Sequence, residues 1–191
     1  DANAAAAAAT YGSVSTWVVT AVTNFNALMD NPLPPFYNLA NFDEDLTGWD
    51  TSGVTEMDSC FSGAYSYNQP VLWVTGSLQN AVNNMFAQAD ALNQPVAFDT
   101  SSVDDMTRLL YTAVSFEQPI NFDTSRCTDM SSMFYHANSF GGSGLTLNWD
   151  TGSVENFGDM FSGAGSFNAI LSDSFTTSSA TNMASMFYQA R

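Results

Sequence analysis

Positive charge is almost missing from this 191-residue sequence, which has no Lys, three Arg and one His against nineteen Asp and Glu. The formal net charge is therefore −16 at pH 7. Nucleic acids and anionic membranes are bound through clusters of Lys and Arg, so the shortage of cations argues against both kinds of partner. No apolar run reaches the roughly 18 residues that a membrane-spanning helix needs. We therefore also expect no transmembrane segment.

The residues that most often carry catalysis or bind metals are equally scarce. Cys60 and Cys127 are the only two cysteines, and His136 is the only histidine. No Ser has the G-x-S-x-G context of a nucleophile elbow, and a single His among scattered Asp has no metal-ligand spacing. Both cysteines stand at apolar positions of the repeat described below, so we expect small buried side chains. The sequence therefore predicts no enzyme, no catalytic residue and no cofactor.

Apolar residues, by contrast, make up 45% of the chain, and only 12% of the residues are charged. This composition supplies enough Phe, Trp, Met and Val to fill a core, so the chain is not predicted to be disordered.

These apolar residues recur as an internal repeat. The first series is spaced by 24 to 32 residues: Met29, Phe61, Phe86, Leu110, Phe134, Phe161 and Phe187. Twelve residues before six of these stands a large aromatic residue: Trp17, Trp49, Phe98, Phe122, Trp149 and Phe175. In the third repeat Val74 occupies that place, with Trp73 one residue earlier. We expect both series to form the core.

The spacing inside one repeat predicts its local structure. The apolar positions of the second repeat follow one face of a short helix: Val54, Met57, Cys60, Phe61 and Ala64. Pro70 and Val71 then indicate the start of a short strand, because proline cannot donate to a sheet from a strand interior. Units of about 25 residues with these elements stack so that each covers its neighbour's core. The predicted fold is an α/β repeat solenoid, each unit a short helix plus a short parallel strand.

Strings such as "FDEDLTGWDTSGVTEMDSCFSGAYSYNQPV" and "INFDTSRCTDMSSMFYHANSF" resemble the repeats of BspA-like leucine-rich-repeat surface proteins. The resemblance extends from about residue 11 to residue 191. It implies a right-handed, leucine-rich-repeat-like solenoid, usually on secreted or surface-exposed proteins of bacteria, protists and algae. It also implies no catalytic residues, because the family pattern contains none.

The repeat sets the expected domain boundaries. We predict an Ala-rich linker over residues 1–10 and a single solenoid domain of about seven repeats over residues 11–191. No polar capping unit follows the last repeat position, at Ala190. An uncapped end exposes apolar core, so we expect that end to be covered by more chain or by a partner.

Two polar columns are candidates for a function. Asp50, Asp99, Asp123 and Asp150 share one register and are weak candidates for a Ca²⁺ site, although capping of a local turn is the interpretation that we favour. A second column could order water as in ice-binding proteins, but turn chemistry is favoured there as well: Thr51, Thr100, Thr124, Thr151 and Thr176.

We therefore predict a non-enzymatic protein-interaction module that acts in recognition or adhesion, secreted or exposed at the cell surface. Its negative charge favours a protein partner with a basic surface. The first alternative is a structural accessory subunit docked in a larger membrane-associated or lumenal assembly, with an organellar lumen as its location. The second alternative is a solenoid that binds Ca²⁺, glycan or ice.

Overall fold

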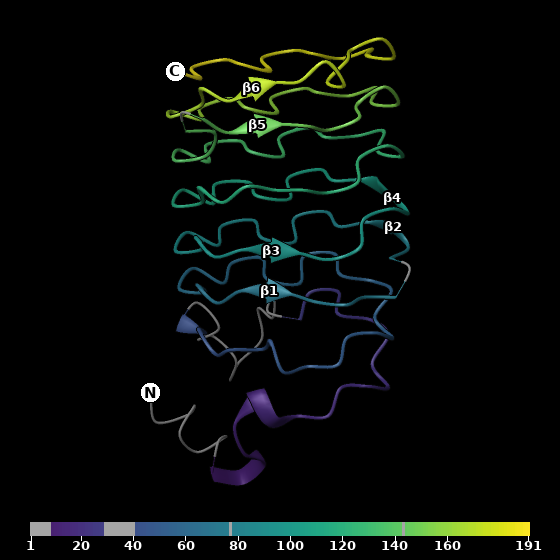
Figure 1. Cartoon of the computed structure of the whole chain (residues 1–191). Coiled ribbons are helices and arrows are strands. Elements are labelled where there is room, and N and C mark those ends of the chain that lie inside the picture. The colour runs from purple at the N-terminus through teal and green to yellow at the C-terminus, as the bar shows by residue number, and fades with distance from the viewer. Residues whose placement is uncertain (1–8, 29–40, 77, 143) are drawn as a thin grey trace.

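The computed structural model describes residues 9–28, 41–76, 78–142 and 144–191. The chain passes repeatedly around one stack, and we call each pass a rung (Figure 1). Backbone hydrogen bonds join seven rungs in six steps: Phe25 to Glu56, Ser59 to Asn83, Asn84 to Thr107, Arg108 to Ser131, Ser132 to Gly158 and Asp159 to Ala184. Residues 1–8 of the predicted linker, and Met29 of the predicted core series, lie outside the described residues.

The prediction of an α/β repeat solenoid with leucine-rich-repeat-like units of one helix and one strand is wrong. From residue 12 onward the described residues contain no α-helix; a 3-10 helix, η1 (Val14–Thr16), lies near the start of the stack. The predicted helix over residues 54–64 is instead a run of turns. No helix among the described residues is long and apolar enough to cross a membrane.

Hydrogen bonding alternates along each run of turns, which explains the misleading spacing. The N–H group of Phe61 donates across to the Met85 carbonyl of the third rung at 2.8 Å. The N–H group of the next residue, Ser62, donates back to the Ser59 carbonyl of its own rung at 3.0 Å. Buried side chains therefore recur at a helix-like spacing, although every second N–H group is bonded to a neighbouring rung.

Left-handed residues also exclude a helix from each rung. Ser132 and His136 flank Phe134 with φ angles of 55° and 51°, and equivalent residues flank the corresponding Phe or Leu of the other rungs. A left-handed conformation costs an L-residue roughly 1–2 kcal/mol. The N–H groups of Ser132 and His136 each donate to a carbonyl of the next rung, at 2.9 Å and 2.8 Å. Stacking thus offsets the strain that a single repeat would carry alone.

Short strands pair in parallel between neighbouring rungs. β1 (Val71–Leu72) pairs with β3 (Val96–Ala97), β2 (Asn80–Ala81) pairs with β4 (Val103–Asp105), and β5 (Thr146–Leu147) pairs with β6 (Ile170–Leu171). Figure 1 shows β1, β3, β5 and β6 one above another along one edge of the stack, with β2 and β4 along another. Isolated parallel bridges continue the β4 column through Asp129, Asn156 and Asn182.

The core is a column of apolar side chains inside the rungs. Nine of the twelve predicted core positions are buried: Trp49, Phe61, Phe86, Phe98, Leu110, Phe122, Phe134, Trp149 and Phe161. The rings also stack between rungs, with the Phe134 centroid 5.6 Å from that of Phe161. The other three positions do not belong to the closed core. Trp17 and Phe187 are 47% and 44% exposed and Phe175 is half-buried, because the described residues cover these end rungs on one side only.

Side-chain amides fix the register of neighbouring rungs. The Asn156 amide nitrogen donates to Asp129 Oδ2 in the preceding rung at 2.9 Å. Asn156 Oδ1 accepts from the Gly158 N–H in its own rung at 3.0 Å and from the Asn182 amide in the following rung at 2.8 Å. One side chain therefore ties three rungs together, and a one-residue slip would break all of these bonds.

Candidate functional site

The Asp column lies on the outside of the stack, where each carboxylate caps a local turn. Asp50, Asp99, Asp123 and Asp150 are exposed. Each Oδ1 accepts the N–H group of the residue two positions later, at 2.9–3.1 Å. This geometry is an Asx turn. The column therefore has a structural role in these four rungs and adds one exposed carboxylate to each of them.

Hydrogen bonds keep three of these carboxylates ionised. The Ser52 hydroxyl and N–H group lower the pKa of Asp50, and the Ser125 hydroxyl and N–H group do the same for Asp123. The N–H group of Ser101, followed by its hydroxyl, lowers the pKa of Asp99. These donors favour the charged form of the acid. This edge of the stack is therefore negative at neutral pH.

The four Asp residues are not brought together into a metal site. Among the described residues, no group of three His, Cys, Asp or Glu side chains lies close enough to hold a metal ion. The Asp residues follow one another along the stack, and their Oδ1 atoms are directed to N–H groups of their own turns. The four Asp residues therefore do not form the cluster of ligands that the predicted Ca²⁺ site would need.

The Thr column is largely internal. Thr51, Thr100, Thr124 and Thr151 are buried, and Thr176 alone of the predicted column is exposed. The buried hydroxyls donate to backbone carbonyls of the next rung, for example from Thr151 to Thr176 at 2.7 Å and from Thr124 to Asp150 at 2.8 Å. These Thr residues tie rungs together and do not form an exposed array that could order ice.

The two cysteines are buried, and among the described residues the single histidine belongs to no cluster that could hold a metal ion. Cys60 and Cys127 are free thiols without access to solvent. Burial raises the pKa of Cys127 to about 12 and raises that of Cys60 as well, so neither thiol forms the thiolate that a nucleophile needs at neutral pH. His136 lies at a left-handed turn position beside Tyr135, with ring centroids 4.4 Å apart.

The structure corrects the register of the third repeat. Trp73, not Val74, takes the buried aromatic position, and its indole nitrogen donates to the Leu46 carbonyl at 3.3 Å. Val74 consequently falls in the Asp column, in the place that Asp50 holds one rung before and Asp99 one rung after. Its side chain is 78% exposed.

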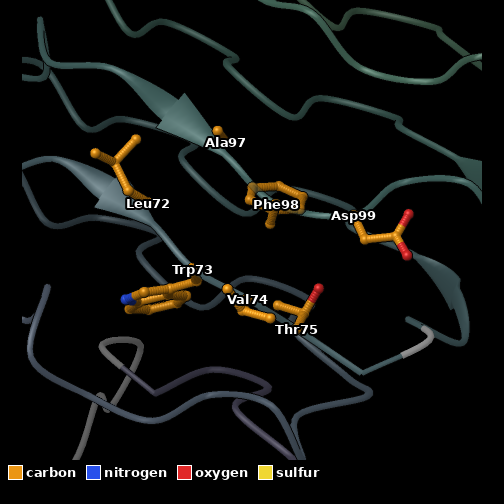
Figure 2. Close-up of a pocket in the computed structure, with 7 residues that line it drawn as sticks. All are labelled: Leu72, Trp73, Val74, Thr75, Ala97, Phe98 and Asp99. Carbon is orange, nitrogen blue, oxygen red and sulfur yellow. The ribbon is translucent and has the colours of Figure 1, made fainter.

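Val74 belongs to an apolar groove that the sequence did not reveal. The groove lies where the paired strands β1 and β3 lead into the following turns; it is open to solvent and has a volume of about 530 Å³. Its lining comes from two adjacent rungs: Leu72, Trp73, Val74, Thr75, Ala97, Phe98 and Asp99. Figure 2 shows Leu72 and Ala97 on the two neighbouring strands, with Val74 and Asp99 following them along the rungs. Leu72 is 52% exposed, so the groove presents aliphatic carbon to solvent beside a carboxylate.

The turn-capping role of the Asp column can be tested with Ser125→Ala. Removing the hydroxyl should raise the pKa of Asp123 toward its ordinary value of 3.8. A depressed folded-state pKa stabilises the protein above the unfolded pKa, and that contribution is lost as pH falls through the folded value. Ser125→Ala should therefore be less stable than the wild type at pH 7 and equally stable below the folded pKa of Asp123. A carboxyl ¹³C NMR titration and thermal melts measure both effects. An unchanged Asp123 pKa would contradict the assignment, and Asp50 is the internal control.

Comparison with known proteins adds a family but no activity. No curated protein and no solved structure matches the chain. A family model described as "Mycoplasma protein of unknown function, DUF285" matches residues 2–121 and again residues 115–191. Because the two matches together extend over nearly the whole sequence, the chain belongs to the DUF285 family.

Proposed function

We propose that this chain is a non-enzymatic protein-recognition module of the BspA-like surface type, acting in recognition or adhesion on the outside of the cell. The repeats that resemble those surface proteins are the ones that form the rungs. Turns capped by an exposed Asp recur along one edge of the stack. The outward side chains of this edge can contact a partner. A basic protein surface is the partner that this charge favours.

The apolar groove is the observation that carries the proposal. Exposed apolar patches rimmed by polar residues mark sites of protein interaction. Here the exposed Leu72 and Val74 lie between rungs that carry Asp50 and Asp99 in the Asp column, and Asp99 lines the same groove. An apolar centre with a charged rim is the usual composition of a protein interface.

A structural accessory subunit is the alternative function. In that case the same acidic edge and groove would be docked permanently on other proteins, in an organellar lumen as well as at a cell surface. The two functions differ in stoichiometry: an accessory subunit has a constant partner in a fixed ratio, whereas an adhesion module does not.

Zero-length carbodiimide cross-linking of the protein in its native source tests the proposal. The reagent joins carboxylates to amines, and this sequence contains no Lys. Cross-links from its Asp and Glu side chains to Lys side chains must therefore lead to other proteins. We expect them to concentrate on Asp50, Asp99 and Asp123, next to the groove. Cross-links spread evenly over all acidic residues, or none, would overturn the proposal. One partner at fixed stoichiometry would favour the accessory subunit.

A further inference from the structure

The residues at equivalent outward positions can be compared from one rung to the next. One outward position directly follows the buried aromatic residue: Asp50, Val74, Asp99, Asp123 and Asp150. A second directly precedes it: Gly48, Leu72, Ala97, Asn121 and Asn148. Among these five rungs, large aliphatic side chains occupy the two positions only in the third, and Ala97 extends the apolar strip into the fourth. In the end rungs the exposed Val18 follows Trp17, and Thr176 follows Phe175. At the position after the buried aromatic residue, the groove is therefore a local departure from the Asp that the second, fourth, fifth and sixth rungs share.

We propose that the groove between β1 and β3 binds a protein segment in which an apolar side chain is flanked by Lys or Arg. The proposal rests on the proposed function and names the site and the chemistry of the partner. The apolar side chain of the segment packs against Leu72, Val74 and Ala97. Its flanking cation lies beside Asp99, which lines the same groove.

Charge complementarity selects this occupant over others. Asp99 stands within the groove, and Asp50 and Asp123 occupy the same column in the rungs on either side. The pKa values of all three carboxylates are lowered by hydrogen bonds from Ser side chains and N–H groups, so they remain charged at neutral pH. With three Arg and no Lys in the whole sequence, little positive charge opposes them. Acidic segments and anionic lipid are repelled, whereas a basic segment is attracted.

The size of the groove fits a short segment. Its volume of about 530 Å³ is in the range of pockets that hold a small ligand, roughly 300–1,000 Å³. Seven residues of two rungs line it, whereas a stable protein interface has roughly 20–30 residues on each side. One or two side chains of a partner therefore enter it, and binding by the isolated segment should be weak.

Val74 cannot accept the hydrogen bond with which Asp caps the turn at this position in other rungs. In the sixth rung Asp150 Oδ1 accepts the Gly152 N–H at 3.1 Å, and the third rung has Gly76 in the place of Gly152. Val74→Asp would restore the residue that the neighbouring rungs use, together with its Asx turn. We expect this variant to fold and to melt at the wild-type temperature or slightly above it, because an Asx cap is gained and an exposed Val is lost.

The binding test uses two synthetic twelve-residue peptides, one alternating Leu with Lys and one alternating Leu with Glu. NMR titration at 0.15 M salt should show the Leu/Lys peptide shifting the amides of residues 71–75 and 97–99. Val74→Asp should weaken this binding at least tenfold, although it adds a negative charge that would by itself attract the peptide. Ile170→Asp is the matched control, because Ile170 is 61% exposed on β6 and the change adds the same charge outside the groove. Its affinity should equal that of the wild type.

Three results would overturn the proposal. Equal or tighter binding by Val74→Asp would mean that charge alone attracts the peptide. Equal binding of the Leu/Glu peptide would mean that the basic flanking residues do not contribute to recognition. Amide shifts scattered over the stack would mean that the peptide does not bind in the groove. None of these results contradicts the proposed function, which fails separately if native cross-linking finds no partner beside the acidic edge.

Discussion

Phe134→Ala should lower the free energy of unfolding by about 3–5 kcal/mol, the range for a buried Phe truncated in a packed core. The Phe134 side chain has no exposed surface and its ring stacks on Phe140 at a centroid distance of 3.8 Å. It also contacts the rings of Trp149 and Phe161 at 5.9 Å and 5.6 Å. Truncation leaves a cavity lined by aromatic rings of two rungs, the fifth and the sixth. Urea unfolding followed by Trp fluorescence measures the change.

Phe187→Ala is the matched control for this prediction. Phe187 holds the same repeat position in the last described rung but is 44% exposed, so less apolar surface is lost on truncation. We expect a loss of about 1–2 kcal/mol, since burial is roughly half complete. Equal losses for the two variants would contradict the assignment of Phe134 to the closed core, as would a change of less than about 0.5 kcal/mol for Phe134→Ala.

Gly163→Ala should destabilise the protein by about 2–4 kcal/mol, from two separate causes. Gly163 has a φ angle of 72°, a conformation that strains any residue with a Cβ atom. A Cβ atom at this position would also collide with the imidazole ring of His136 in the preceding rung. His136 must therefore move, and it is held at its own left-handed position. Thermal and denaturant unfolding measure the loss.

Gly63→Ala separates the two causes. Gly63 holds the same repeat position with the same φ angle of 72°, but none of the described residues has an atom within 4 Å of a Cβ atom placed there. Only the backbone strain of about 1–2 kcal/mol should remain. A smaller effect for Gly163→Ala than for Gly63→Ala would contradict the stacking of His136 on Gly163. In a His136→Ala background the two glycine substitutions should cost the same.

The repeat and most of its core could be predicted from sequence, because both depend on which residues recur at which distance. Phe61 and Phe134 recur at equivalent places and are buried. The secondary structure could not be predicted in the same way. Spacing reports which side chains share a face, and a run of turns with left-handed residues at Ser132 and His136 produces the same spacing as a short helix.

The candidate site was missed for a related reason. The Asp column was visible because four Asp residues share a register, and the local hydrogen bonds of Asp123 are those of a turn cap. The groove depends instead on a one-residue shift in the third repeat. Aligning Trp73 with the other aromatic residues would have placed Val74 in the Asp column and revealed an exposed aliphatic residue. That the two rungs form a groove follows only from the pairing of β1 with β3.

Every statement about the outward columns depends on the rungs being stacked in this register. Scalar couplings across hydrogen bonds, measured by long-range HNCO NMR, identify the carbonyl that each N–H group bonds. We predict a coupling from the Phe134 nitrogen to the Met160 carbonyl carbon, whose oxygen lies 2.9 Å from that nitrogen. A coupling from Phe134 to Met130, four residues earlier as in an α-helix, would contradict the stacked-turn fold and the groove that it forms.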